Sequence, residues 1–254
     1  MRIASWNVNS FKVRADHLSQ FLAESGTDII GLQELKGETI DTAPLKTARY
    51  HVEYVGQKAY NGVAIATRHM GAVVATRLAG DADDTQARYI EMAFPWGNVL
   101  NCYMPNGNPL GTEKFTYKLA WLKRLHARVA ALRTARTPFV LLGDFNIIPM
   151  PIDCYDPLAW AGDALFQPES RGAYQALLNT GMVDAFRHLH TDTQAYTFWD
   201  YQAGCWPRNL GIRIDHILLS PTLVPLLRDC QIDRTPRGWE KASDHTPIWI
   251  DLDV

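Results

Sequence analysis

The sequence predicts a mixed α/β fold in which two β-sheets pack against each other. Short apolar runs recur along the whole chain, few segments show helical spacing, and several runs follow one another without a helix between them. Because parallel neighbours need a long crossover, this order favours antiparallel pairing and packed sheets over one purely parallel sheet. With 254 residues and 47% hydrophobic content, the chain can bury a large core, so we expect one domain over residues 1–254.

Each predicted strand is a short apolar or alternating run bounded by turn residues. The run before Gly143 is apolar at every position, which is typical of a strand buried on both faces. Gly143 lets the chain turn at the end of this run. In chain order the predicted strands are Ile3–Asn7, Ile29–Gln33, Gly62–Thr67, Tyr89–Phe94, Val99–Met104, Pro138–Leu142, Tyr196–Trp199, Arg213–Leu219, Cys230–Asp233 and Ile248–Leu252.

Two helices are predicted from apolar residues that recur at helical spacing. The first covers Val13–Glu24, and Gly26 is its expected stop. The second covers Thr112–Leu132. Its apolar face is expected to consist of Phe115, Leu119, Leu122, Val129 and Leu132. The charged residues of the same helix that are expected to point elsewhere are Lys118, Lys123, Arg124 and Arg128.

Composition narrows the class of protein. No apolar stretch approaches the roughly 20 residues of a membrane helix, so no membrane partner is expected. The four cysteines show no Cys-x-x-Cys spacing, which indicates neither a disulfide framework nor a zinc ribbon. A cytoplasmic monomer is expected. Because the formal net charge is −2, a nucleic-acid partner would have to be held by a local basic face.

Polar residues suited to phosphate chemistry follow several of the predicted strands. The clearest case is Gly143-Asp144-Phe145-Asn146, which comes directly after a buried strand, although a Gly-Asp-x-Asn segment is more often a plain turn. The other residues at strand ends are Asn7, Glu34, Tyr103, Asp215, Asp244 and His245. Each alone is more often an ordinary loop residue, but together they would supply a metal site, a base and an anion stabiliser.

These residue types match the needs of phosphodiester hydrolysis, which requires a cation on the phosphate oxygens and an activated water. Glu34 is the expected ligand of Mg²⁺, and Asp144 the expected base or water-orienting group. Asn7 and Asn146 can hold the water without adding charge. His245 becomes an imidazolium if Asp215 lies beside it, and Tyr103 is expected to donate to the phosphate or position it.

The order and spacing of these motifs resemble the exonuclease III family, within the endonuclease/exonuclease/phosphatase superfamily that includes DNase I. The resemblance spans essentially the whole chain. Its motifs are Ser5-Trp6-Asn7-Val8-Asn9, Leu32-Gln33-Glu34-Leu35-Lys36, Tyr60-Asn61-Gly62-Val63-Ala64-Ile65, Gly143 to Asn146, Arg213-Ile214-Asp215-His216 and Ser243-Asp244-His245. It implies a four-layered α/β sandwich of two packed mixed sheets flanked by helices. It also implies a Mg²⁺-dependent DNA-repair enzyme, with Mn²⁺ able to substitute.

Family members of this kind remove nucleotides from 3′ ends of duplex DNA, clear blocked 3′ ends and cut 5′ to abasic sites. By motif position, Glu34 would be the main metal ligand, Asp144 and Asn146 would activate the water, and Asn7 would support them. Asp215 with His245 would act on the phosphate, together with Tyr103 and the amide of Asn106. The expected metal site draws on Glu34, Asn7, Asp144, Asn146 and Asp244. The chain departs from some family members at two positions, and both affect the expected balance of activities. Asn9 stands where some members have an aspartate, and Ile212 stands where some have a tryptophan.

DNA contact is expected from loops beside the site rather than from global charge. The candidate phosphate neighbours are Lys36, Lys58, Arg171, Arg208 and Arg213, although any one of them is more often a solvated surface charge. Tyr60 and the Trp206–Arg208 pair are expected to touch DNA, with an aromatic packed on its own loop as the alternative for Trp206. Phe198, Ile212 and Ile214 would line a pocket for a flipped sugar, or pack in the core. The long segment 147–167 is expected to flank the substrate.

Two other classes of function stay open. A superfamily phosphodiesterase or phosphatase acting on a small phosphorylated substrate would keep the same metal and histidine apparatus and differ only in its substrate loops. A catalytically inactive DNA-binding module would have no use for the full set of polar residues. The leading hypothesis is a repair nuclease that acts on double-stranded DNA, including abasic sites and blocked or recessed 3′ ends, and that associates with the nucleoid during repair.

Overall fold

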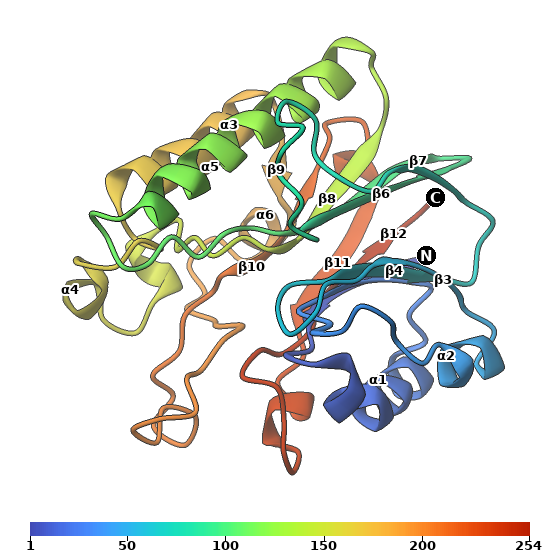
Figure 1. Ribbon diagram of the computed structural model, residues 1–254, viewed down its shortest axis with the longest axis horizontal. Coiled ribbons are helices and arrows are strands. Elements are labelled where there is room, and N and C mark those ends of the chain that lie inside the picture. Colours follow the sequence, from blue (N-terminus) through green and yellow to red (C-terminus); the bar gives the residue numbers. More distant parts are fainter.

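A computed structural model describes residues 1–254 and contains two mixed six-stranded sheets packed face to face (Figure 1). The first sheet has the order β11-β12-β1-β2-β4-β3 and consists of β1 (Arg2–Asn7), β2 (Ile29–Gln33), β3 (His51–Val55), β4 (Val63–Thr67), β11 (Leu227–Ile232) and β12 (Ile248–Leu252). The second has the order β5-β6-β7-β8-β10-β9 and consists of β5 (Ala72–Ala75), β6 (Tyr89–Phe94), β7 (Gly97–Tyr103), β8 (Phe139–Asp144), β9 (Val183–Asp184) and β10 (Asp215–Leu219).

Helices cover the outer faces of both sheets, so the predicted four-layered sandwich is confirmed (Figure 1). The first sheet is covered by α1 (Phe11–Ser25) and α2 (Ala43–Thr47), and the second by α3 (Glu113–Thr134) and α5 (Pro168–Asn179). Shorter helical segments are α4 (Pro157–Trp160), α6 (Ala185–Leu189), η1 (Pro151–Asp153), η2 (Val224–Leu226) and η3 (Thr235–Gly238). None of these helices has the length and apolarity needed to span a bilayer.

The strands of the central layers are buried on both faces. In β2, Ile29 packs between the two sheets, whereas Ile30 and Leu32 pack under α1. The same holds in β8, where Leu142 faces the first sheet and Leu141 faces α3. A strand between a sheet and a helix layer needs apolar residues at every position, which explains its continuous apolar run.

The two sheets approach closely beside the ends of β1, β2, β7 and β8. A Cβ atom on Gly31 would lie 2.3 Å from Leu142 Cδ1, so only glycine fits there without a shift. Between the sheets, Asn101 Nδ2 donates to the carbonyl oxygens of Leu32 (2.9 Å) and Ala64 (2.8 Å). Gln33 Nε2 donates in turn to Asn101 Oδ1 at 2.6 Å. These bonds hold the edge of both sheets that carries the polar residues.

One predicted strand is wrong and several elements differ in extent. Tyr196–Trp199 is not a strand, because its backbone is divided between two partners: Phe198 forms isolated bridges with both Ile212 and His245. The strand predicted from Arg213 begins at Asp215. Sequence reasoning also missed β3 and β5, which are partly or largely exposed and have weak apolar patterns, and α5.

The long helix α3 carries its charged residues differently from the prediction. Thr112 is its N-cap and accepts from Lys114 N, in agreement with the predicted start. Lys118 was expected to point away from the core but is fully buried, at 0% exposure. Arg124 and Arg128 are paired with Asp84 and Glu91, respectively, so they serve as links to neighbouring segments.

Candidate active site

The site residues lie together because parallel strand pairs end at the same edge of each sheet. Asn7 ends β1 and is in register with Gln33 of the parallel strand β2, directly before Glu34. Tyr103 ends β7 and is in register with Asp144, which ends the parallel strand β8. Asp215 begins β10 opposite Asp144 in an antiparallel pair. The register of the two sheets therefore brings an amide, a phenol and three carboxylates to one place.

Two carboxylates share one amide group at the centre. Asn7 Nδ2 donates to Glu34 Oε1 and to Asp144 Oδ2, each at 3.0 Å. Tyr103 OH donates to Glu34 Oε1 at 2.9 Å, and Lys36 Nζ lies 2.8 Å from Glu34 Oε2. Burial raises the pKa of Glu34, but Lys36 and the hydrogen bonds outweigh it, so the net pKa lies below its usual value. Glu34 is therefore a carboxylate at neutral pH.

Burial and two neighbouring carboxylates keep Tyr103 protonated. Desolvation, with the charges of Glu34 and Asp144, raises the pKa of Tyr103 well above its usual value. The phenol is therefore a hydrogen-bond donor over the whole physiological pH range. It points toward the same carboxylate that Asn7 contacts, so it helps to fix the orientation of Glu34.

His245 is paired with one carboxylate and faces another. Its Nδ1 lies 2.8 Å from Asp215 Oδ2, and its Nε2 lies 3.7 Å from Asp144 Oδ2. Burial lowers the pKa of His245, but Asp215 and Asp144 outweigh it and raise the net pKa. The ring is therefore an imidazolium at neutral pH. Phe198 packs edge-on against it, with ring centroids 5.0 Å apart.

Asp144 is almost completely buried between this imidazolium and the central amide. Burial raises the pKa of Asp144, His245 opposes this effect, and the charge of Asp215 adds to it, so the net pKa is raised. Its Oδ1 accepts from the backbone N of Asn146 at 2.9 Å, and this contact orients the carboxylate. A carboxylate with a raised pKa is a better proton acceptor near neutral pH than an exposed one.

Two amides beside this centre are held by a lysine that sequence reasoning missed. Asn106 Nδ2 donates to Asn146 Oδ1 at 3.1 Å, and Asn146 Nδ2 donates to Met104 O at 2.9 Å. Lys118 Nζ donates to the carbonyl oxygens of Asn146 (2.5 Å) and Asn106 (3.0 Å). The signal for its burial was the spacing of Lys118 from Trp121, Leu122 and Leu125, which are the residues that face the core.

Replacing Lys118 with methionine is expected to lower kcat by about 10- to 100-fold, because a displacement of ~1 Å in a catalytic group can cost that much. The methionine leaves two buried carbonyls without their donor and frees the loops that carry Asn106 and Asn146. Steady-state kinetics on a DNA substrate measure this, and KM is expected to change less than kcat. Lys123→Met, an exposed lysine on the same helix, is the matched control and should leave kcat unchanged. An equal loss in both variants would contradict a positioning role for Lys118.

The donor set suits a divalent cation that prefers oxygen ligands. Potential ligand atoms of Glu34, Asp144 and His245 all lie within 4.8 Å of one another. Because His245 is an imidazolium, the two carboxylates are the ligands that this conformation offers, as Mg²⁺-type sites require. The other expected ligands have different partners: Asn7 Oδ1 accepts from Asn9 N (3.0 Å), and Asn146 Oδ1 accepts from Asn106. The carboxylate of Asp244 accepts from Asn9 Nδ2 at 2.9 Å.

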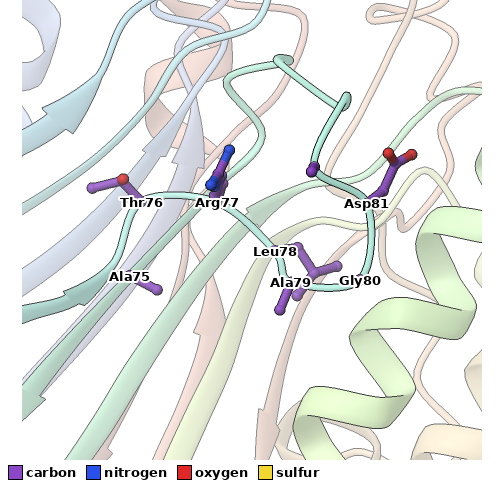
Figure 2. Close-up of a pocket in the computed structure, with 8 residues that line it drawn as sticks. Ala75, Thr76, Arg77, Leu78, Ala79, Gly80 and Asp81 are labelled. Atoms are coloured by element: carbon purple, nitrogen blue, oxygen red, sulfur yellow. The ribbon is translucent and has the colours of Figure 1, made fainter.

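A polar recess of about 520 Å³ adjoins this centre. Tyr103 and Asn106 belong both to its wall and to the site. Tyr60, with 70% of its surface exposed, lies at the same recess, together with Arg88 and Lys114. Figure 2 shows a different recess of about 460 Å³, whose lining residues all come from the single segment 75–82, which begins at the last residue of β5. It contains none of the expected site residues, so it is separate from the site.

Arg213 is not a surface contact for DNA. Its side chain is 0% exposed, and it forms ion pairs with Asp153 (2.7 Å) and Asp184 (2.9 Å). Its Nη1 also lies 3.0 Å from Nδ1 of His216, whose pKa is lowered to about 4 by burial and by the charge of Arg213. The arginine therefore belongs to a buried network that ties β10 to the segment after Asn146.

The other residues expected to contact DNA differ in their exposure and in their partners. Trp206 packs on its own loop and neighbours, and its ring centroid lies 4.8 Å from that of Trp199. The guanidinium groups of Arg234 and Arg237 lie 5.0 and 5.3 Å from the Trp206 ring centroid. Arg208 is exposed. Arg171 donates from Nε to Pro149 O at 3.0 Å, within the segment that follows the site. Ile212 and Ile214 are buried, at 0% and 2% exposure, so ordinary core packing describes them and only Phe198 is partly exposed.

Comparisons with known proteins support one family. Residues 4–245 match the model of the Endonuclease/Exonuclease/phosphatase family. The chain is 33% identical over 266 residues to exodeoxyribonuclease III of Haemophilus influenzae, covering 99% of this chain and all of the relative. Two solved structures superpose over the full length of both chains with TM-scores of 0.96. They are the 3′ phosphatase NExo from Neisseria bound to a product DNA hairpin (38% identical) and an AP endonuclease from Archaeoglobus fulgidus (36% identical).

Proposed function

The chain belongs to the endonuclease/exonuclease/phosphatase family, and from that premise we propose that it is a DNA-repair phosphodiesterase. Its activities are 3′→5′ exonuclease action on duplex DNA, cleaning of blocked 3′ ends and cleavage at abasic sites. The observation that carries the proposal is the joint placement of Glu34 and Asp144 beside the Asp215–His245 pair. Full-length similarity to an exodeoxyribonuclease III, a 3′ phosphatase and an AP endonuclease supports the choice of DNA as substrate.

Asp144 serves the attacking water in this mechanism. As a carboxylate, its Oδ2 accepts a proton as the water oxygen forms its bond to phosphorus. Asn7 donates to the same Oδ2, and Asn146 N donates to Oδ1, so the carboxylate keeps one orientation. The bond from phosphorus to the leaving oxygen of the sugar breaks as the new bond forms, and the leaving oxygen takes a proton from solvent.

His245 and the amide of Asn106 serve the phosphate. The imidazolium holds its proton on Nε2, next to the site of reaction, and can donate it in a hydrogen bond to a phosphate oxygen that gains charge. Asp215 keeps that proton in place by raising the pKa of the ring. Asn106 is fixed by Asn146 and Lys118, and it lines the recess where the substrate strand is proposed to lie.

Glu34 and Asp144 are the residues that would hold a divalent cation, and we assign Mg²⁺ to them, with Mn²⁺ as a substitute. When bound, the ion neutralises charge on the phosphate oxygens and lowers the cost of their approach to two carboxylates. Glu34 is the ligand best prepared for this task, because Tyr103, Asn7 and Lys36 already keep it ionised and oriented. Asp244 is not in the group of ligand atoms that lie within 4.8 Å of one another.

The DNA-binding surface is proposed to run from the recess beside Tyr103 across the site to the exposed loops. Tyr60, Lys36, Arg171, Arg208 and Trp206 are its candidate contacts, with Phe198 next to the reacting phosphate. Because any phosphate contacts would dominate affinity, binding is expected to weaken steeply with salt. A cytoplasmic enzyme with this surface would act on nucleoid DNA.

One assay tests the proposal. The protein is incubated with duplexes that carry a recessed 3′ end, a 3′-phosphate or an abasic-site analogue, in Mg²⁺, Mn²⁺ or chelator. We expect cleavage in either metal and none in chelator. A phosphoinositide and sphingomyelin are included because a superfamily enzyme for small substrates would share the same centre. Turnover of the small substrates without DNA cleavage, or cleavage unaffected by chelator, would falsify the repair-nuclease assignment.

A further inference from the structure

One asparagine beside the proposed metal site binds a cation at one end of its amide and an anion at the other. Asn9 Oδ1 accepts a hydrogen bond from Lys36 Nζ, and Asn9 Nδ2 donates to Asp244 Oδ1 at 2.9 Å. The same Lys36 Nζ lies 2.8 Å from Glu34 Oε2. An ammonium and an amide therefore bridge the whole distance between Glu34 and Asp244.

The backbone and neighbours of Asn9 hold this bridge in place. Its φ of +44° is a left-handed conformation that asparagine adopts more readily than most residues. Asn9 N donates to Asn7 Oδ1 at 3.0 Å, and Arg14 Nη1 donates to Asn9 O at 2.6 Å. Nδ2 also donates to Tyr201 OH at 3.2 Å. With both backbone groups and both ends of the amide bonded, Asn9 has little freedom to turn away from Asp244.

Lys36 already fills the space in which a second ion would meet Glu34. Its ammonium lies 2.8 Å from Glu34 Oε2, so a divalent cation shared by Glu34 and Asp244 would have to displace a positive charge that is already paired.

We propose that Asn9 and Lys36 occupy the place of a second metal ion, so that this enzyme works with one divalent cation, held by Glu34 and Asp144. Asp244 is then an acceptor for Asn9 rather than a metal ligand, in keeping with its position outside the group of ligand atoms within 4.8 Å of one another. This inference rests on the proposed function, because it takes the metal at Glu34 and Asp144 as given.

The test counts metal ions on the free protein, without DNA. Metal-free wild type and the double variant Asn9→Asp/Lys36→Met are titrated with Mn²⁺, and bound ions are measured by calorimetry and by electron paramagnetic resonance of the free ion. In the variant, a carboxylate oxygen replaces the amide that faces Asp244 at 2.9 Å, and the ammonium is gone. Two ionised carboxylates in contact repel each other, and a cation bound between them removes that repulsion. We expect one ion on the wild type and two on the variant.

The matched control is Asn179→Asp/Lys12→Met, which makes the same chemical changes at exposed positions and should bind one ion. Two tight ions on the wild type would overturn the inference while leaving the nuclease assignment intact. A single ion on the Asn9→Asp/Lys36→Met variant, with a native circular dichroism spectrum, would overturn it as well. A wild type that binds no ion would instead remove the metal site on which the proposed function depends, and the inference with it.

Discussion

Asp144→Asn is expected to lower kcat by about 10³- to 10⁴-fold, the upper range for a group that takes a proton from the nucleophile. Asparagine has nearly the same shape, and its Oδ1 can still accept from Asn146 N. It cannot accept a proton at neutral pH, and it removes one of the two carboxylates proposed to hold the metal. Single-turnover cleavage of a duplex with a recessed 3′ end, measured at saturating enzyme, separates this loss from a loss of DNA binding.

Two controls make that loss interpretable. Asp192→Asn changes an exposed aspartate in the same way and is expected to keep full activity. Thermal unfolding checks the fold, and Asp144→Asn should be no less stable than wild type, because the substitution removes a buried carboxylate whose pKa is raised by burial. A variant that keeps more than about a tenth of wild-type kcat would show that the proton goes elsewhere, since a general base contributes about 100-fold or more.

The convergence of the site residues could be predicted because it depends on local signals. A buried apolar run identifies a strand, and the residue after it must lie at the edge of a sheet. That reasoning located Asn7, Glu34, Tyr103 and Asp144, and the structure places them within hydrogen-bonding distance of one another or of a shared neighbour. The fold class followed in the same way, because consecutive strands without a helix between them predicted packed sheets.

Contacts between distant segments could not be predicted from the sequence. The spacing of Lys118 on its helix indicates burial, but its partners, the carbonyls of Asn106 and Asn146, approach from two loops that the spacing does not reveal. Arg213 was expected to contact phosphate because the sequence does not show its partners. In the structure it is buried and paired with Asp153 and Asp184. A charged residue shows its environment only once its partners are known, and these partners are far away in the chain.

The strand predicted at Tyr196–Trp199 failed for a related physical reason. The segment has the alternation and aromatic content of a strand, but Phe198 bridges both Ile212 and His245 instead of pairing along one neighbour. Propensity describes how well a residue suits a strand, whereas a ladder also needs a partner backbone in register. Here the segment has no regular strand pairing, and Phe198 packs against the imidazolium ring.

Asp215→Asn is expected to lower kcat at neutral pH by about 10²- to 10³-fold by depriving His245 of its proton. In the wild type, burial alone would lower the pKa of His245, and the charges of Asp215 and Asp144 reverse that effect. Asparagine keeps a hydrogen-bond acceptor 2.8 Å from Nδ1 but carries no charge, so the pKa of the ring falls. The proton proposed to meet the phosphate is then lost as pH rises through the neutral range.

The raised pKa of His245 determines in which direction the activity of each protein changes with pH. His245 has a raised pKa in the folded protein, so wild-type activity should persist into alkaline solution, whereas the activity of the variant should begin to fall at a lower pH. The same raised pKa contributes stability that is complete below the ordinary histidine value and is lost as pH rises through the folded value. Profiles of kcat/KM against pH for both proteins test this, with His245→Gln as the control that has no ionisable ring. If Asp215→Asn keeps the alkaline limb of the wild type, Asp215 does not hold the proton, and its contact with His245 Nδ1 serves only to orient the ring.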